Sequence, residues 1–494
     1  MKDIQNIPFG FTEIRVTDIK NEVPNRALLA EPLPHKEILS ALMNKINPVN
    51  FREMSGLEGD EKLKLSHFLI ITVEEIMNLA WLNQWGICRN HDFIYLYNSA
   101  YWSLIDTDEL KTFLGESSEK MGTQKYQARY YQFRDQLYKQ FLALGTLPKA
   151  EHRNDIVLIN LKNGTFEFSP TGTKLRQFEP KDFLTYQLPF EHDPTAKAPL
   201  FEKYLSRVLP DVESQNILSE YLGYVFIHPS ILKLEKTLLL YGPGANGKSV
   251  FFDIVNAILG CENVSSYSLQ SLTDTTGYFR AKLANKLVNY ASEINGNLET
   301  SIFKQIVSGE PVEARLPYGE PFILSNYAKL IFNCNELPRD VEHTKAFFRR
   351  FLIIPFDVTI PDEEQDKGLS KKIIQSELPG VFNWILSGLN RLISQGNFSP
   401  CKAAELQLAS YQRQSDSVQV FVEENEYQKH PSEYKLIKEL YSEYRIFAIE
   451  DGFKPVSKVN FNKRLNHIGV IVEKKNIGNV AFLSKVATLY KDPF

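Results

Sequence analysis

The stretch LLLYGPGANGKS, residues 238–249, decides the fold of this chain. Its apolar start predicts a buried strand, and the periodic residues 250–259 predict a helix that ends at Gly260. The turn between them matches the pattern G-x-x-x-x-G-K-[ST], in which glycines let backbone N–H groups surround an anion at the positive end of a helix. Because a strand precedes the turn and a helix follows it, a chance match is the weaker interpretation.

This loop predicts a site for ATP and Mg²⁺. The lysine of the pattern reaches the β- and γ-phosphates, and the hydroxyl residue after it ligates the magnesium ion. The residues expected to bind ATP are Gly242, Pro243, Gly244, Ala245, Asn246, Gly247, Lys248, Ser249 and Val250.

Composition sets the broad class of the chain. With 494 residues, 43% of them hydrophobic, we expect a globular protein of about three domains. The net charge of −4 gives no global basic field, so any nucleic-acid surface must be local. The cysteines are too far apart for a zinc ribbon, and we find neither a signal peptide nor a long apolar run. We therefore expect a cytoplasmic protein, in the host cell, that does not bind membranes.

The first 55 residues are weakly patterned, and we expect a loose lead-in with one short helix near 36–45. A long helix is predicted over 60–85, a hairpin over 93–105 and a helical stretch over 107–144. A second hairpin is predicted over 156–168, before a proline-rich connector at 180–199 and further helices over 200–227.

Within the helical stretch 107–144, basic and aromatic residues alternate. Such a pattern can bind single-stranded nucleic acid by stacking and charge, but a helix packed on one side and solvated on the other is more common. The residues concerned are Lys125, Tyr126, Arg129, Tyr130, Tyr131, Phe133 and Arg134.

Two further apolar runs after the loop end in polar residues. Residues 286–291 lead into Ser292 and Glu293, and residues 328–334 lead into Asn335. The carboxyl ends of parallel strands meet at one edge of a sheet, where ligands bind. Glu293 is then placed to polarise an attacking water and Ser292 to assist the Mg²⁺ shell. Asn335 could contact the γ-phosphate or the water, or it could simply form a turn.

A hairpin is predicted around Tyr318, and paired arginines follow at Arg349 and Arg350, before the strand 352–356. Arginines flanked by apolar residues need anionic partners. A neighbouring subunit's γ-phosphate and a surface salt bridge are the two alternatives.

The order of these motifs resembles a superfamily 3 helicase, most closely the poxvirus-type branch found in phage and plasmid primase-helicases. The motifs are the phosphate loop, Ala-Ser-Glu at 291–293, Gly-Glu-Pro at 309–311, Asn-Glu-Leu-Pro at 335–338 and the arginine pair. Upstream, residues 163–166 and 185–196 are similar to the domain that precedes the helicase in those proteins. The resemblance covers roughly residues 90–360.

The resemblance implies roles for individual residues. Lys248 and Ser249 would form the Walker A motif, Glu293 would be the Walker B base and Asn335 the first sensor. Arg350, with Arg349 as the alternative, would be an arginine finger acting in trans. The hairpin would grip single-stranded DNA in the pore. The residues expected to bind DNA in this part of the chain are Arg315 and Tyr318 of the hairpin, and Lys304 before it.

The C-terminal part continues in helices over 384–408, with a break between 396 and 400. The tail, from about residue 415, predicts three helices and then two strands, with the third helix at 459–467 and the hairpin at 469–483. This order is typical of a winged helix, which binds DNA or docks on proteins. The basic residues expected to contact DNA there are Lys458, Lys463, Arg464, Lys474 and Lys475.

We therefore expect an α/β fold with an AAA+-like ATPase core, preceded by a mixed α+β domain and followed by a winged helix. The expected divisions are a lead-in at 1–55, an N-terminal domain at 56–195, a helical collar at 196–235, the ATPase core at 236–360, a helical connector at 361–413 and the winged helix at 414–494.

The resemblance implies an ATP-dependent DNA helicase of a mobile genetic element. It would form a hexameric ring on single-stranded and forked DNA and move 3′ to 5′. The short lead-in leaves no obvious room for a primase, so we expect a separate primase or polymerase as a partner. The alternatives are an ATP-switched initiator that loads a replisome without unwinding, and a primase-helicase with a cryptic primase in residues 1–150.

Overall fold

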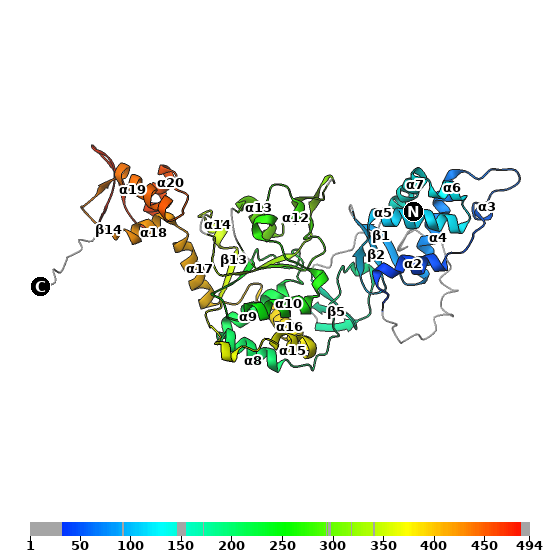
Figure 1. Ribbon diagram of the computed structural model, residues 1–494, viewed down its shortest axis with the longest axis horizontal. Coiled ribbons are helices and arrows are strands. Elements are labelled where there is room, and N and C mark those ends of the chain that lie inside the picture. The colour runs from blue at the N-terminus through cyan, green and yellow to red at the C-terminus, as the bar shows by residue number, and fades with distance from the viewer. Residues whose placement is uncertain are drawn as a thin grey trace. The chain divides into compact units, whose positions relative to one another are not determined.

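The computed structural model describes residues 32–90, 93–145, 155–170, 172–292, 294, 298–317, 319–338 and 341–485. The chain divides into two compact units, residues 1–192 and 193–494, and each is described by itself (Figure 1). Of the predicted site residues, Glu293 and Tyr318 lie outside the described residues.

The first unit combines helices with two antiparallel sheets. Its helices are α2 (His35–Lys45), α3 (Phe51–Met54), α4 (Leu65–Leu82), α5 (Thr107–Met121), α6 (Lys125–Arg129), α7 (Tyr131–Leu144) and the short η1 (Pro180–Asp182). One sheet has the order β1 (Gly86–Asn90), β2 (Phe93–Tyr97), β3 (Trp102–Leu104), and the other β4 (Val157–Leu161), β5 (Gly164–Ser169), β6 (Gly172–Arg176).

One expectation for this unit needs correction, and a second, the helical stretch 107–144, is confirmed and refined. The segment from residue 32 to 55 is not a loose lead-in, because Ile38, Leu42 and Phe51 are buried in the same core as helix α4. The earlier residues, up to 31, lie outside the described part. The stretch 107–144 is three helices, since Gly122 adopts φ 119° after α5 and Tyr130 is extended between α6 and α7.

Helix α4 is long and apolar enough to cross a membrane by length and composition, which the sequence analysis did not anticipate. One such helix is weak evidence, because core helices pass the same test. Its inward face, with Val73, Ile76 and Ala80, packs in the core of the unit, which accounts for its apolar composition.

The second unit is built on a parallel sheet with the strand order β13-β7-β12-β9-β8. The strands are β7 (Thr237–Tyr241), β8 (Val264–Ser265), β9 (Val288–Ala291), β12 (Lys329–Cys334) and β13 (Phe351–Pro355). All their pairings are parallel. The central strands are buried on both faces, which is why they are continuous apolar runs in the sequence.

Helices cover this sheet, and α9, α10 and α16 pack together beside it (Figure 1). The helices are α8 (Pro199–Val208), α9 (Val212–Tyr224), α10 (Lys248–Leu259), α11 (Leu269–Leu272), α12 (Tyr278–Ala281), α13 (Thr300–Ser308), α14 (Lys345–Phe348), α15 (Leu369–Ser376), α16 (Leu378–Gln395) and α17 (Lys402–Gln414), with η2 (Cys261–Asn263) and η3 (Asp362–Glu364). The strands β10 (Val312–Arg315) and β11 (Pro321–Leu324) form a separate antiparallel hairpin.

The last part of the chain has its own hydrophobic core. Its helices are α18 (Ser417–Glu424), α19 (Ile437–Glu450) and α20 (Lys458–His467), and its strands are β14 (Tyr427–Lys429), β15 (Lys435–Leu436), β16 (Val472–Lys475), β17 (Gly478–Ala481) and β18 (Leu483–Lys485). The three helices and the β16–β17 hairpin occur in the predicted order. Strands β14, β15 and β18 are additions to that prediction, and we keep the winged-helix assignment as a proposal.

Candidate active site

The loop between β7 and α10 has a backbone that only glycine tolerates at two positions. Gly242 has φ 151° and Gly247 has φ 86°. A Cβ on Gly242 would lie 2.3 Å from the Phe356 carbonyl oxygen, and one on Gly247 would lie 2.6 Å from the Val208 side chain. Both glycines are therefore required by φ and by close contact. The loop therefore adopts the backbone conformation in which a G-x-x-x-x-G-K-[ST] sequence can surround a phosphate.

Three neighbouring elements hold this loop from behind. Tyr204 of α8 donates a hydrogen bond of 2.8 Å from its hydroxyl to the Gly247 carbonyl oxygen. The Asn246 side-chain amide donates to the Phe356 carbonyl oxygen at 2.8 Å, just after β13. The Gly242 N–H donates to the carbonyl oxygen of Cys334 at 3.2 Å, at the end of β12. The loop is therefore fixed relative to the carboxyl edge of the sheet.

The outer side of the loop is open. Pro243, Gly244 and Ala245 are exposed, and a Cβ on Gly244 would meet no atom within 4 Å. A loop that is closed behind and open in front, at the N-terminus of α10, fits a bound phosphate chain.

Lys248 lies inside this loop. Its ammonium donates to the carbonyl oxygens of Gly242 at 2.7 Å and Pro243 at 2.9 Å, and to Asn246 Oδ1 at 3.0 Å. Burial lowers the pKa of Lys248, and the nearby Cys334 thiol opposes that shift. The next residue, Ser249, is exposed at the first turn of the helix, where a hydroxyl can reach a metal ion beside the phosphates.

The predicted strand ends meet at the same edge. Ser292 follows β9 and Asn335 follows β12, and both are exposed. Strand β12 pairs with both β7 and β9, so Asn335 directly follows the strand beside the phosphate loop. A second amide, Asn333, is buried and accepts a 2.9 Å hydrogen bond from the Tyr290 hydroxyl, which gives it a structural role.

The two arginines lie at the opposite edge of the sheet. The Arg350 carbonyl oxygen accepts a 2.8 Å hydrogen bond from the N–H of Thr237, the first residue of β7. Strands β13 and β7 run parallel from this point, and the phosphate loop begins only after Tyr241. An extended strand rises about 3.3 Å per residue, so the five residues of β7 separate the arginines from their own loop by about 16 Å.

The arginine side chains have different environments. Arg350 is 9% exposed and donates to Ser308 Oγ at 2.9 Å and to the Ala346 carbonyl oxygen, while its Nε has no partner within the described residues. Burial, followed by the charge of Arg349, lowers the pKa of Arg350. Arg349 is 49% exposed and its guanidinium contacts the Glu235 carboxylate. Burial alone would raise the pKa of Glu235, but the contact with Arg349 brings it below its ordinary value.

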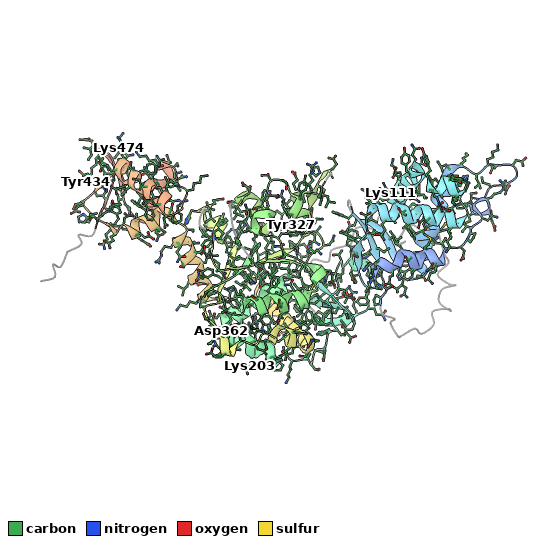
Figure 2. All side chains as sticks on the ribbon, viewed as in Figure 1. Lys111, Lys203, Tyr327, Asp362, Tyr434 and Lys474 are labelled. Atoms are coloured by element: carbon green, nitrogen blue, oxygen red, sulfur yellow. The ribbon has the colours of Figure 1, made fainter. Side chains whose placement is uncertain are left out.

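The β10–β11 hairpin projects from the same unit. Its base is fixed by Tyr327, labelled in Figure 2, whose hydroxyl donates to the Glu310 carbonyl oxygen at 2.7 Å. The buried Arg280 donates to the Glu313 carbonyl oxygen at 2.8 Å and so attaches β10 to α12. Arg315 is exposed and donates across the turn to the Gly319 carbonyl oxygen at 2.8 Å.

Lys304, predicted to bind DNA, is engaged within the chain. Its ammonium contacts both carboxylate oxygens of Glu342, at 2.8 and 2.6 Å. Its hydrogen bond is the main reason that the pKa of Glu342 lies below its ordinary value. In this conformation the charge of Lys304 is satisfied by its neighbour, whereas Arg315 remains accessible at the hairpin tip.

The basic residues of the last part fall into two groups. Lys458, Lys463 and Lys474 are exposed. Arg464 donates to Asp416 Oδ1 at 3.1 Å, at the start of α18, and the ammonium of Lys475 lies 3.9 Å from the ring centroid of Tyr434. Figure 2 shows Lys474 and Tyr434 on this part of the chain.

Sequence reasoning missed Tyr204, Glu235, Ser308 and Arg280, which position the loop, the arginines and the hairpin. None belongs to a motif, and each acts on a residue far away in the chain. A tyrosine or an arginine in a helix gives no local signal of the carbonyl oxygen that it will reach.

Two regions of the chain match family models. Residues 74–210 match a family described as D5 N terminal like, and residues 240–350 match a family of unknown function, DUF5906. No curated protein matches the chain.

Solved structures of the C-terminal region of NrS-1 are similar at low identity. One apo structure is 11% identical with a TM-score of 0.43, covering 83% of this chain and 98% of that chain. Another is 14% identical with a TM-score of 0.41, covering 82% of this chain and 97% of that chain. The relationship rests on the two sequence regions instead, which include the phosphate loop and the arginine pair. The chain therefore carries a D5 N-terminal-like region, the region found in poxvirus D5-like superfamily 3 helicases, joined to a phosphate-loop region that matches the DUF5906 model.

Proposed function

We propose that the chain is an ATP-driven replicative DNA helicase of a mobile genetic element. It acts as a homo-oligomeric ring, expected to be hexameric, that moves 3′ to 5′ on single-stranded DNA and separates a forked duplex. A separate primase or polymerase would supply the primers.

The observation that carries this proposal is the position of the arginine pair relative to the phosphate loop. The loop follows the carboxyl end of β7, and Arg349 and Arg350 precede the amino end of β13, its neighbour. A subunit cannot bring either guanidinium to its own phosphates across the sheet, but an adjacent subunit can. This arrangement supports hydrolysis at subunit interfaces, as a ring motor requires.

The exposure of Arg349 favours it over Arg350 as the arginine that reaches a neighbour's nucleotide. Arg350, which the sequence put first, is occupied by Ser308 and the Ala346 carbonyl oxygen. We therefore assign the finger to Arg349 and a supporting role to Arg350.

Lys248 and the loop N–H groups would hold the phosphates of ATP, and Ser249, assisted by Ser292 and Glu293, would hold Mg²⁺. Bound Mg²⁺–ATP supplies the phosphoanhydride whose hydrolysis drives movement. Asn335 would orient the attacking water or the γ-phosphate. The hairpin tip at Arg315 would contact the sugar-phosphate backbone of the translocating strand.

The test is unwinding of a forked duplex by the wild type beside Lys248→Ala and Arg349→Ala. Lys203→Ala, which removes an exposed lysine of α8 labelled in Figure 2, is the matched control and should keep full activity. We expect unwinding only by wild type and control, with hydrolysis stimulated by single-stranded DNA. Mixing the two inactive variants should restore part of the hydrolysis, because Lys248→Ala subunits still carry Arg349 for the intact loops of their neighbours.

If the chain hydrolyses ATP but releases no strand from forks of either polarity, the proposed helicase function is wrong and the initiator or loader function is favoured. Synthesis of primers from nucleotides would instead reveal a cryptic primase. If the mixed variants form rings normally but recover no hydrolysis, Arg349 does not act at the ATP site of a neighbouring subunit.

A further inference from the structure

Three tyrosines of the first unit are exposed to solvent and do not pack in its hydrophobic core. Tyr126 lies on α6, Tyr130 in the junction and Tyr131 at the start of α7, and their residues are 78%, 49% and 64% exposed. On α7 the core-facing positions are taken by other residues, among them Phe133 and Leu137, which are buried. We call these three residues the tyrosine face.

The helix break brings two of these rings together. Consecutive residues of one helix diverge around its axis, so their side chains do not meet. Tyr130, however, is extended, with φ −70° and ψ 130°, between the two helices. The rings of Tyr130 and Tyr131 therefore lie 5.0 Å apart, at an angle of 68°, and Gln132 Nε2 donates to the Tyr131 hydroxyl at 3.1 Å.

The charge of the same segment is basic. Residues 125–144 contain four basic side chains and one acidic side chain, Asp135. Asp135 is paired with Lys111 of α5 at 2.8 Å, and Arg129 with Glu119 at 2.8 Å. Lys125 and Lys139 are exposed and form no ion pair within the described part of the chain. Glu116 of α5 is a nearby acidic group that reduces this excess without removing it.

The composition of the face points to its occupant. Exposed residues around the tyrosines are Gln132, Gln136 and Lys125, Gln127 is half-buried, and no aliphatic side chain is exposed among residues 125–136. A protein interface would be expected to bury aliphatic groups at its centre. Flat rings beside amides and unpaired ammonium groups suit unstacked bases on an anionic backbone.

We propose that the tyrosine face is a second binding site for single-stranded nucleic acid, in which bases stack on Tyr126, Tyr130 and Tyr131 and phosphates lie near Lys125 and Lys139. It is separate from the pore hairpin, which belongs to the other unit. It does not depend on ATP, so it can hold a strand while the motor is not engaged. This inference goes beyond the proposed motor activity and does not require it.

The experiment measures binding of a fluorescent oligothymidylate to the full chain without nucleotide, beside an abasic strand of equal length. Replacing Tyr126, Tyr130 and Tyr131 together by alanine should weaken oligothymidylate binding about tenfold or more, since stacking on one ring is worth about 1–3 kcal/mol. Binding of the abasic strand should change little. Replacing the same residues by phenylalanine should retain binding, because the rings remain. The control Leu82→Ala alters an equally exposed apolar residue of the unit and should have no effect.

Photocrosslinking with 5-bromouracil in the strand then locates the contact, and we expect adducts within residues 126–131. ATP hydrolysis in the absence of DNA should be equal in wild type and both triple variants, which shows that the second unit is intact. Equal binding by the alanine variant, or adducts confined to the second unit, would overturn the proposal. Loss of self-association without loss of strand binding would identify a protein interface and also overturn it. A chain that binds strands here but unwinds no fork would refute the motor function only.

Discussion

Tyr204 donates a hydrogen bond of 2.8 Å to the carbonyl oxygen of Gly247, so helix α8 holds the phosphate loop from behind. The Tyr204 ring is buried, and burial raises the pKa of its hydroxyl well above the ordinary value, which keeps it a donor. The loop is thus part of a packed arrangement with α8 rather than an independent turn.

Replacing Tyr204 by phenylalanine should weaken ATP binding by up to about tenfold. The Gly247 carbonyl oxygen would lose its partner, at a cost of about 1–2 kcal/mol, and the loop would lose its fixed orientation. Titration with a fluorescent ATP analogue measures the change. Tyr221→Phe is the control, because it removes a comparable buried hydrogen bond, to the Leu330 carbonyl oxygen at 2.7 Å, far from the loop. If both variants bind ATP alike, the Tyr204 hydrogen bond has no specific effect on the loop.

Replacing Arg350 by alanine should lower the stability of the second unit, by about 2–4 kcal/mol, whereas Arg349→Ala should lower only hydrolysis. Arg350 is buried between Ser308 and the end of α14, and its loss leaves Ser308 without that donor. The Arg349 side chain is half exposed, and an ion pair that solvent reaches, such as the one with Glu235, adds little to folding.

Urea unfolding followed by tryptophan fluorescence compares these two variants. Arg207→Ala is the control, since it breaks an exposed ion pair with Glu364 at 2.9 Å. The assignment would be reversed if Arg349→Ala were the destabilised variant and Arg350→Ala folded normally but lost hydrolysis.

Replacing Lys463 by glutamine should reduce binding to duplex DNA, while Arg464→Gln should mainly reduce stability. Lys463 is exposed on α20, and Arg464 of the same helix is engaged by Asp416 at 3.1 Å. If Lys463 contacts a phosphate, the slope of log K against log salt should fall by about 1. An unchanged slope for Lys463→Gln would favour a protein-docking role for this part of the chain.

Motifs that lie within one local stretch were predictable from the sequence. The phosphate loop is such a stretch, and Ser292 and Asn335 were placed because parallel strands must end at one edge. The relative roles of Arg349 and Arg350 were not predictable, because their partners are distant in the chain: Glu235 contacts both arginines, and Ser308 contacts Arg350. The pairing of Lys304 with Glu342 was missed for the same reason.

Elements too short to show a periodic pattern were also not predicted from the sequence. Strand β8 has two residues and α12 has four, too few for either pattern to emerge. The break at Tyr130 was hidden because aromatic and basic residues on both sides continue a helical spacing. The sequence therefore left two alternatives for this stretch, a nucleic-acid-binding surface or a helix packed on one side, and only the structure shows that the three tyrosines are exposed.

Lys329 provides a prediction about pH. It begins β12, its ammonium lies 4.4 Å from the ring centroid of Tyr224, and burial lowers its pKa to about 8. The pKa of an unfolded lysine is about 10.4, so between these values the unfolded chain binds more protons than the folded chain. Stability from this group must therefore rise as pH increases through 8, because the cost of burying the charge disappears.

We expect Lys329→Met to melt about 3 °C or more above the wild type at pH 7, with a difference that shrinks steadily toward pH 10. Comparing the two proteins at each pH cancels the titration of the tyrosines, which both share. Lys282→Met, at an exposed lysine, should show no such trend. A difference that stays constant from pH 7 to pH 10 would mean that Lys329 titrates normally, and that the Tyr224 ring and local solvent fully offset the burial of its charge.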